Sequence, residues 1–336
     1  MSSAHRWTIR QWFLSTPRGK RSNGMDVIGL GRFVVDMFAG EWDRPIREVD
    51  SFLKYPGGAP ANVVVALARL GVRTGLISRV GNDEFGIYLV DFLRKEGIDT
   101  THVGFDSERR TSLSFCGTAR FGDFPFFQYG EPGPNLRLRP ADISEGYIKK
   151  ARILFTSGTI FSASPSREAG LTALSCARKN QVITAFDINY REGFWESRDV
   201  ARVHYKLILG LSDVVFGTNA ELGYVGGNED VDRAAAGILE LGAKMVCVKF
   251  GERGSRIFTQ SETIDIPAFQ VEPFDCSGAG DSYNAGFLYG PLKGWNLRRC
   301  GEFASAVSAI VVTRRGASVA TPTLAEVEAF LNSYRR

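Results

Sequence analysis

Residues 275–287 read Asp-Cys-Ser-Gly-Ala-Gly-Asp-Ser-Tyr-Asn-Ala-Gly-Phe and place a run of small residues at the start of a helix expected over residues 278–289. Gly-Ala-Gly there leaves backbone N–H groups free, with the positive end of the helix dipole behind them. Such a cradle stabilises an anion, including one that develops on a transferring phosphoryl group. Asp281, in the first turn, can accept a proton from an attacking hydroxyl. The alternative is that Asp281 is only a favourable first-turn acid.

A second glycine-rich stretch, Gly57-Gly58-Ala59-Pro60-Ala61-Asn62, precedes a helix expected over residues 60–70. Two glycines let a polar ligand approach the backbone, and the free N–H groups of the helix start are ready donors. Asn62 offers both a donor and an acceptor, which suits sugar hydroxyls. The alternative is a plain turn followed by a helix cap.

Outside these motifs, predicted strands and helices alternate along most of the chain, which predicts an α/β fold with a mostly parallel sheet. A small β-sheet lid interrupts the alternation, with strands from about residues 38–56 and 101–130 and a hairpin turn at Gly122-Asp123. The remaining segments complete the pattern. Strands are expected at 26–38, 74–80, 153–157, 182–188, 213–216, 245–250, 255–259 and 263–268, and helices at 83–96, 166–179, 198–209, 231–241, 297–313 and 324–334.

Composition and charge exclude several classes of protein. The 336 residues are 44% hydrophobic and carry a net charge of +4. Residues 1–25 hold five Lys and Arg and no acid, so the remainder is nearly neutral, which argues against nucleic acid as a partner. No apolar run approaches the roughly 18 residues of a membrane span. Five widely spaced cysteines favour a reducing, cytoplasmic location. Residues 1–24 are expected to be a disordered basic tail or a mis-assigned start before Met25.

Two nucleotide-binding fingerprints are not matched. Gly29-x-Gly31 follows a strand, but Val34 occupies the third glycine position of a dinucleotide fingerprint. No Gly-Lys pair followed by Ser or Thr forms a Walker A loop.

Together, the 57–62 and 275–287 motifs resemble the two signatures of the ribokinase-like (PfkB) carbohydrate kinases, and the resemblance covers about residues 26–334. It implies a three-layer α/β/α fold with a β lid over a sugar site, and transfer of the ATP γ-phosphate to a sugar hydroxyl. Residue by residue, it implies that Asp281 is the catalytic base. The anion hole would comprise Gly278, Ala279 and Gly280, and the sugar would be held by Asp36, Gly57, Gly58 and Asn62.

Three further stretches extend the resemblance. Asp187-Ile-Asn189-Tyr-Arg191 resembles a segment of fructokinases and sugar-acid kinases, so Arg191 would lie near the substrate or phosphates; its alternative is a surface ion pair. In Gly217-Thr218-Asn219-Ala220-Glu221, Thr218 would face the nucleotide and Glu221 would order Mg²⁺ through water. Lys249-Phe-Gly251-x-x-Gly254 resembles the nucleotide-side turn, with Lys249 replacing a small polar residue. Cys276 similarly replaces a threonine.

The acceptor is either a sugar acid or a neutral sugar. The opening of the chain looks most like 5-dehydro-2-deoxygluconate kinases, whereas the helix after Asn62 leans toward fructokinases; 2-keto-3-deoxygluconate is a further alternative. Where the acid kinases carry Tyr-Arg-Glu in the lid, this chain has Tyr129-Gly130-Glu131, so one cation for a carboxylate is missing. A non-catalytic sugar-binding regulator is the alternative of another class. The resemblance also allows a monovalent-cation requirement and a homodimer formed through the lid.

Overall fold

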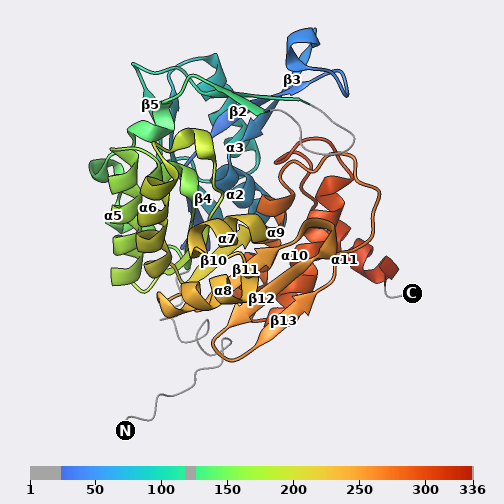
Figure 1. Ribbon diagram of the computed structural model, residues 1–336. Helices are drawn as coiled ribbons and strands as arrows, with labels where there is room; N and C mark the ends of the chain where they lie inside the picture. The colour runs from blue at the N-terminus through green and yellow to red at the C-terminus, as the bar shows by residue number, and fades with distance from the viewer. Residues whose placement is uncertain (1–23, 118–125, 335–336) are drawn as a thin grey trace.

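A nine-stranded sheet organises the computed structural model, which describes residues 24–117 and 126–334 (Figure 1). The strand order is β13-β12-β11-β10-β9-β8-β1-β4-β5, and the neighbours are parallel except at the β12 pairings. The strands are β1 (Val27–Leu30), β4 (Thr74–Gly81), β5 (Val103–Asp106), β8 (Ile153–Ser157), β9 (Ile183–Asp187), β10 (Val214–Thr218), β11 (Met245–Lys249), β12 (Ser255–Thr259) and β13 (Thr263–Ile266).

Helices cover both faces of this sheet, as predicted for a three-layer α/β/α fold. Successive residues of a strand pack against helices on opposite faces of the sheet: Val27 lies in one hydrophobic core, and Ile28 and Leu30 lie in the other. The first layer contains α2 (Ala59–Arg69), α3 (Glu84–Lys95), α9 (Ala279–Lys293), α10 (Leu297–Val312) and α11 (Leu324–Tyr334). The second contains α4 (Glu145–Ile148), α5 (Ser166–Lys179), α6 (Arg198–Gly210), α7 (Asn219–Gly226) and α8 (Val231–Glu240).

A separate four-stranded sheet, in the order β3-β2-β6-β7, corresponds to the predicted lid and is called the lid below. Its strands are β2 (Val34–Ala39), β3 (Phe52–Gly57), β6 (Leu113–Cys116) and β7 (Phe126–Tyr129). The antiparallel pairing of β6 with β7 confirms the predicted hairpin, but the Gly122-Asp123 turn lies outside the described residues.

Two boundaries of the predicted lid are wrong. The expected strand over residues 26–38 is broken, because the chain leaves the large sheet after β1 and enters the lid as β2; Gly31, with φ of 144°, lies at this change of sheet. Val103–Asp106, assigned to the lid, pairs with β4 in the large sheet. An apolar pattern shows that a strand is buried and does not show which sheet it joins.

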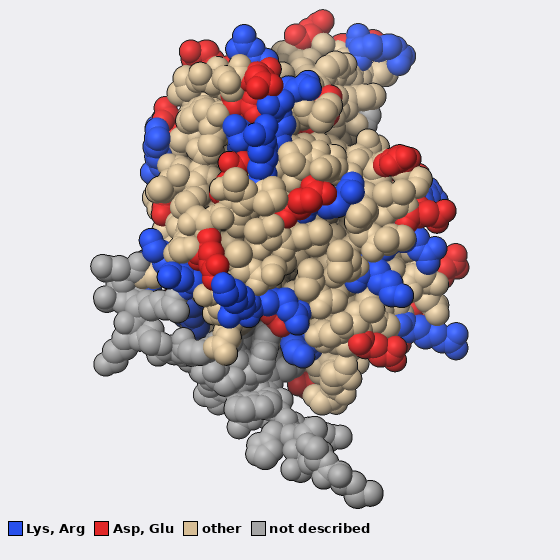
Figure 2. All heavy atoms as spheres, turned by 90° about the vertical axis from the view of Figure 1, so that its left-hand side faces the viewer, with Lys and Arg blue, Asp and Glu red and all other residues tan. Residues whose placement is uncertain are grey.

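Charged side chains of both signs are interspersed on the face seen in Figure 2. At the β4–β5 edge, Arg79 and Arg137 both pair with the buried Asp106, at 3.1 and 3.0 Å.

All five cysteines are unpaired. Among residues 24–117 and 126–334, no helix combines the length and the apolar character needed to cross a membrane.

Candidate active site

The start of α9 forms the predicted backbone cradle. Gly278 has φ of 74°, and a Cβ placed on it would lie 2.6 Å from the Cβ of Ala317, so glycine is required here. Asp275 holds the preceding turn, because its two carboxylate oxygens accept from the amides of Ser277 and Gly316 at 2.8 and 2.9 Å. The amide of Ala279 donates to the carbonyl of Cys276 at 3.2 Å.

This last contact changes the predicted anion hole. Because the Ala279 amide already has an acceptor, the cradle has fewer free donors than the three expected. Within the described part of the chain, the amides of Gly278 and Gly280 have no acceptor. The free donors of the cradle therefore come from Gly278 and Gly280 and point outward from the helix start.

Asp281 and Asn62, the polar residues of the two predicted motifs, are in direct contact. The Nδ2 of Asn62 donates to a carboxylate oxygen of Asp281 at 2.7 Å, across 219 residues of sequence. The Oδ1 of Asn62 accepts from the hydroxyl of the buried Ser318. Since Ser318 occupies the oxygen of the Asn62 amide, the NH₂ group of that amide must face Asp281. The Asp281 carboxylate is thereby oriented by a side chain from the other motif.

The electrostatics around Asp281 suit a proton acceptor. Burial raises the pKa of the Asp281 carboxyl above its usual range, and the hydrogen bond from Asn62 partly offsets this rise. The cations of Lys249 and Arg191 also lower that pKa, whereas the Glu221 carboxylate raises it. Asn62, Lys249, Arg191 and Glu221 therefore all act on Asp281, as a common site requires.

Asp36, on strand β2 of the small sheet, lies against the turn that enters α2. A Cβ on Gly57 would meet the Asp36 carboxylate at 1.8 Å, so the carboxylate rests on the Gly57 backbone. Gly58, with φ of 105°, is the N-cap of α2, and its Cβ would meet the Arg32 carbonyl oxygen at 2.4 Å. Burial raises the pKa of Asp36 to about 6; the Arg32 guanidinium opposes this rise and the Asp281 carboxylate adds to it.

Lys249, at the end of β11, lies beside the cradle. Its Nζ donates to Asp187 and to the Oδ1 of Asn284, both at 3.2 Å, and Asn284 donates to Asp187 at 3.0 Å. A Cβ on Gly280 would lie 3.3 Å from that Nζ, so the ammonium borders the free amides. Burial raises the pKa of Asp187 to about 6, and the Lys249 ammonium opposes the rise.

Glu221 connects two loops at the carboxyl edge of the sheet. One of its oxygens accepts from the amide and hydroxyl of Thr218 at 2.8 and 3.0 Å, which completes a capping box on α7. The other accepts from the amide of Tyr190 at 2.9 Å, next to the exposed Arg191. In residues 24–117 and 126–334, no group of three or more His, Cys, Asp or Glu is arranged to hold a metal directly.

Residues 27–324 of this sequence match the family model described as pfkB family carbohydrate kinase. The chain belongs to the PfkB family of carbohydrate kinases. A 5-dehydro-2-deoxygluconokinase from Geobacillus kaustophilus is 38% identical over 317 residues, which cover 93% of this chain and 95% of that protein. A solved fructokinase from Xylella fastidiosa with bound ATP superposes with a TM-score of 0.84 at 26% identity, covering 92% of this chain and 99% of that one.

A fructokinase from Vibrio cholerae, solved with fructose, ADP and calcium ion, is similar in fold. It gives a TM-score of 0.82 at 28% identity and covers 91% of this PfkB kinase and 99% of that chain. The resemblance derived from the two motifs is thus confirmed, and so is the expected enzyme class.

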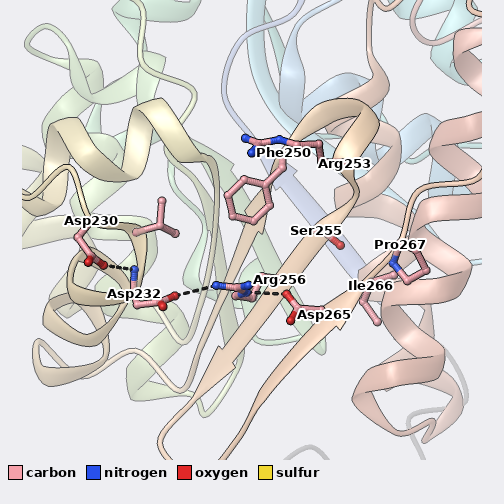
Figure 3. A pocket seen from close by; sticks show the side chains of 10 residues that line it. Asp230, Asp232, Phe250, Arg253, Ser255, Arg256, Asp265, Ile266 and Pro267 are labelled. Carbon is pink, nitrogen blue, oxygen red and sulfur yellow. Dashed lines mark hydrogen bonds and ion pairs between the residues drawn. The ribbon is translucent and has the colours of Figure 1, made fainter.

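A cavity of about 550 Å³, whose lining does not include Asp281, lies beside the predicted nucleotide-side turn of this PfkB kinase (Figure 3). Phe250 and Arg253 line it, next to the predicted Gly251 and Gly254. Gly254 is required by the fold, since its Cβ would meet the Ile266 carbonyl at 2.1 Å. Three of the cavity's charged side chains pair with one another, because Arg256 contacts both Asp232 and Asp265. The contacts around Asp281 define the candidate site of this PfkB kinase better than the volume of the cavity does.

Three residues of the site were not predicted: Arg32, Asn284 and Ser318. Asn284 lies one helical turn after Asp281 in the second motif, so the i, i+3 spacing could have placed it on the same side. Ser318 and Arg32 lie in loops without periodicity, and their partners are distant in sequence. No local pattern in the sequence of this PfkB kinase points to either residue.

Proposed function

We propose that this kinase transfers the γ-phosphoryl group of ATP to a hydroxyl of a sugar acid, with 5-dehydro-2-deoxygluconate as the preferred acceptor. The observation that carries this proposal is the 2.7 Å contact between Asn62 and Asp281 at the start of α9. It joins a proton acceptor, a hydroxyl-binding amide and free backbone donors at one point. The name of the relatives at 35–38% identity supports the choice of acceptor.

In this mechanism, the acceptor hydroxyl donates to Asp281, which removes its proton as the oxygen attacks the γ-phosphorus; the bond from that phosphorus to the bridging oxygen breaks, and ADP leaves. The raised pKa of Asp281 increases its ability to hold that proton. The amides of Gly278 and Gly280 and the Lys249 ammonium face the charge that develops on the transferring group. Asn62 and Asp36 hold other hydroxyls of the acceptor and align it for in-line attack.

Thr218 and the turn that contains Gly251 and Gly254 are proposed to border the nucleotide, and Arg191 to contact the acceptor or phosphates. The donor set fits magnesium held through water and phosphate, because Glu221 has free lone pairs and its charge acts on both Asp187 and Asp281. When bound there, Mg²⁺ would neutralise charge on the phosphates. Glu221 would orient the water molecules between them.

The test is an ATP-dependent assay with five acceptors: 5-dehydro-2-deoxygluconate, 2-keto-3-deoxygluconate, fructose, ribose and adenosine. We expect the highest kcat/KM with 5-dehydro-2-deoxygluconate. A higher kcat/KM with fructose would reject the sugar acid in favour of a neutral sugar. Turnover of none of the five, with sugar binding retained, would favour a regulator.

We also propose that the lid forms a homodimer interface. On β7, which is an edge strand of the described lid, Phe126, Phe127 and Tyr129 are 43%, 49% and 60% exposed. An exposed aromatic edge strand is well suited to pair with a second copy. Light scattering should give twice the mass of the chain, and Phe127→Lys should halve it. A monomeric wild-type protein would contradict the proposal.

A further inference from the structure

Arg32 is a buried cation in the loop that carries the chain from the large sheet to the lid. It is 6% exposed, and its guanidinium lies over the ring of Phe194 at 4.8 Å. Its carbonyl oxygen touches Gly58, and its charge acts on Asp36. Arg32 therefore borders the proposed acceptor site, between the start of α2 and the loop after β9.

The partners of Arg32 leave donors unused. Its Nη2 donates to Glu131 at 2.7 Å and to the Oε1 of Gln128, both from the lid side. The Oε1 of Gln128 also accepts from the Ser114 hydroxyl at 3.3 Å, which fixes the orientation of that amide. In the part of the chain that the structure describes, the Nε of Arg32 and the Nε2 of Gln128 are buried without an acceptor. Buried donors of native proteins generally have partners, so two together indicate that a ligand supplies the acceptor.

The charges indicate which kind of ligand. Glu131 is shared, because its second oxygen accepts from the amide of Gly133 at 2.6 Å. Arg191 is a second cation close enough to act on Arg32. A carboxylate, with two acceptor oxygens in one plane, would satisfy the free Nε–H of Arg32 with one oxygen and the Nε2 of Gln128 with the other. A single sugar hydroxyl has less acceptor capacity and no charge.

We propose that Arg32, assisted by Gln128, binds the carboxylate of the sugar acid and determines the specificity of the enzyme for acids over neutral sugars. The inference rests on the proposed function and deepens it. It assigns the cation that the lid sequence Tyr129-Gly130-Glu131 does not provide. In the alternative, Arg32 only fastens the lid through its ion pair with Glu131.

Two variants separate these roles. Arg32→Gln removes the cation and keeps a polar side chain, whereas Glu131→Gln removes the ion pair and keeps the cation. For a carboxylate-binding Arg32, we expect Arg32→Gln to raise KM for 5-dehydro-2-deoxygluconate by about 10- to 100-fold, the loss of one charge-assisted hydrogen bond. KM for ATP should change less than about twofold. Glu131→Gln should leave KM for the acid unchanged or lower it. Arg32→Lys, which keeps the charge, should recover part of the loss.

The outcomes are distinguishable. If both variants raise KM for the acid equally, Arg32 only holds the lid and the inference is rejected. An unchanged KM in Arg32→Gln also rejects it, while wild-type turnover of the acid keeps the proposed function. Absence of any sugar-acid turnover in the wild type rejects the proposed function itself. If Arg32→Gln unfolds below assay temperature, Arg32→Lys and Glu131→Gln decide: a rise in KM for the acid in Arg32→Lys alone supports the inference, and any other result refutes it.

Discussion

Replacing Asp281 by asparagine separates the proposed catalytic base from a merely favourable helix acid. The substituted side chain would keep the shape of the original, and its carbonyl oxygen can still accept from Asn62, whose amide is held by Ser318. The fold should therefore persist. Loss of a general base lowers kcat by about 10²- to 10⁴-fold. We expect Asp281→Asn to fall in that range, with KM for ATP little changed.

The stability of the same variant provides a second, opposite criterion. Burial raises the pKa of Asp281, so its ionised form costs folding free energy at neutral pH. The neutral variant should have a Tm equal to or above that of the wild type. A helix-dipole role instead predicts a loss of about 0.3–1 kcal/mol, or roughly 1–4 °C. Below its folded-state pKa the wild-type carboxyl is protonated, so the difference in Tm should shrink as pH falls.

The assay combines steady-state turnover with thermal unfolding of the ligand-free protein at pH 8 and pH 5. Asp199→Asn is the matched control, since Asp199 is an exposed acid in the first turn of α6. The control should keep its kcat and lose a little Tm. If Asp281→Asn behaves like Asp199→Asn in both measurements, Asp281 is not the catalytic base.

Three further predictions concern the cradle, its lysine and Asp36. Gly278→Ala should destabilise the protein by about 2–4 kcal/mol in denaturant unfolding, because alanine is strained in the left-handed backbone and its Cβ meets Ala317. The control Gly237→Ala, in the interior of α8, should stabilise the protein by about 0.5–1 kcal/mol. Equal effects of the two variants would contradict the geometry. Lys249→Met should lower the free energy of unfolding by about 3–5 kcal/mol, because it leaves Asp187 buried without its cation. The double variant with Asp187→Asn should recover this stability but not the wild-type KM for ATP. Recovery of both would assign Lys249 a structural role only. Because the pKa of Asp36 is about 6, kcat/KM for the acceptor should fall as pH drops through that value. The stability contributed by protonated Asp36 has the opposite dependence: it is present near pH 4 and lost as pH rises through 6. Asp36→Asn should remove both dependences, and their persistence in that variant would assign them to another group.

Most of the helices could be predicted from the sequence because capping residues mark where they begin and end. Asp83 accepts from the amide of Gly86 at the start of α3, and Gly71, with φ of 82°, follows the end of α2. Thr323 and Glu326 form a capping box at the start of α11. The break in the first strand carried no such mark, since Val27–Leu30 and Val34–Ala39 are both apolar and only the φ of Gly31 separates them.

The candidate site was predictable to the extent that its chemistry lies within short motifs. Asp281 and Asn62 were each placed at a helix start by local patterns, and their contact confirms that the two motifs meet. Arg32 was missed because its partners Gln128 and Glu131 are 96 and 99 residues away. The number of free backbone amides in the cradle is one lower than predicted, because the sequence does not show that the Ala279 amide donates to the carbonyl of Cys276.

The meeting of the two motifs is a consequence of topology. Pro60 of α2 lies against Gly31, just past the end of β1, and Gly280 of α9 lies against Lys249 at the end of β11. Both helices thus begin at the carboxyl edge of the parallel sheet, where their positive dipole ends converge. That convergence lets the fold keep the carboxylates of Asp281, Asp36, Asp187 and Glu221 close together. Burial, and to a smaller extent this proximity, raises the pKa of the first three.

A nucleotide adds further negative charge to this group of acids. Of the three cations described at the site, Lys249 is engaged by Asp187 and Arg32 by Glu131, and the single charge of Arg191 does not balance the phosphates. The charge of the site therefore supports the proposed requirement for a divalent cation. It also explains why the acceptor's carboxylate should be bound at Arg32, beside the lid, rather than among the acids that surround Asp281.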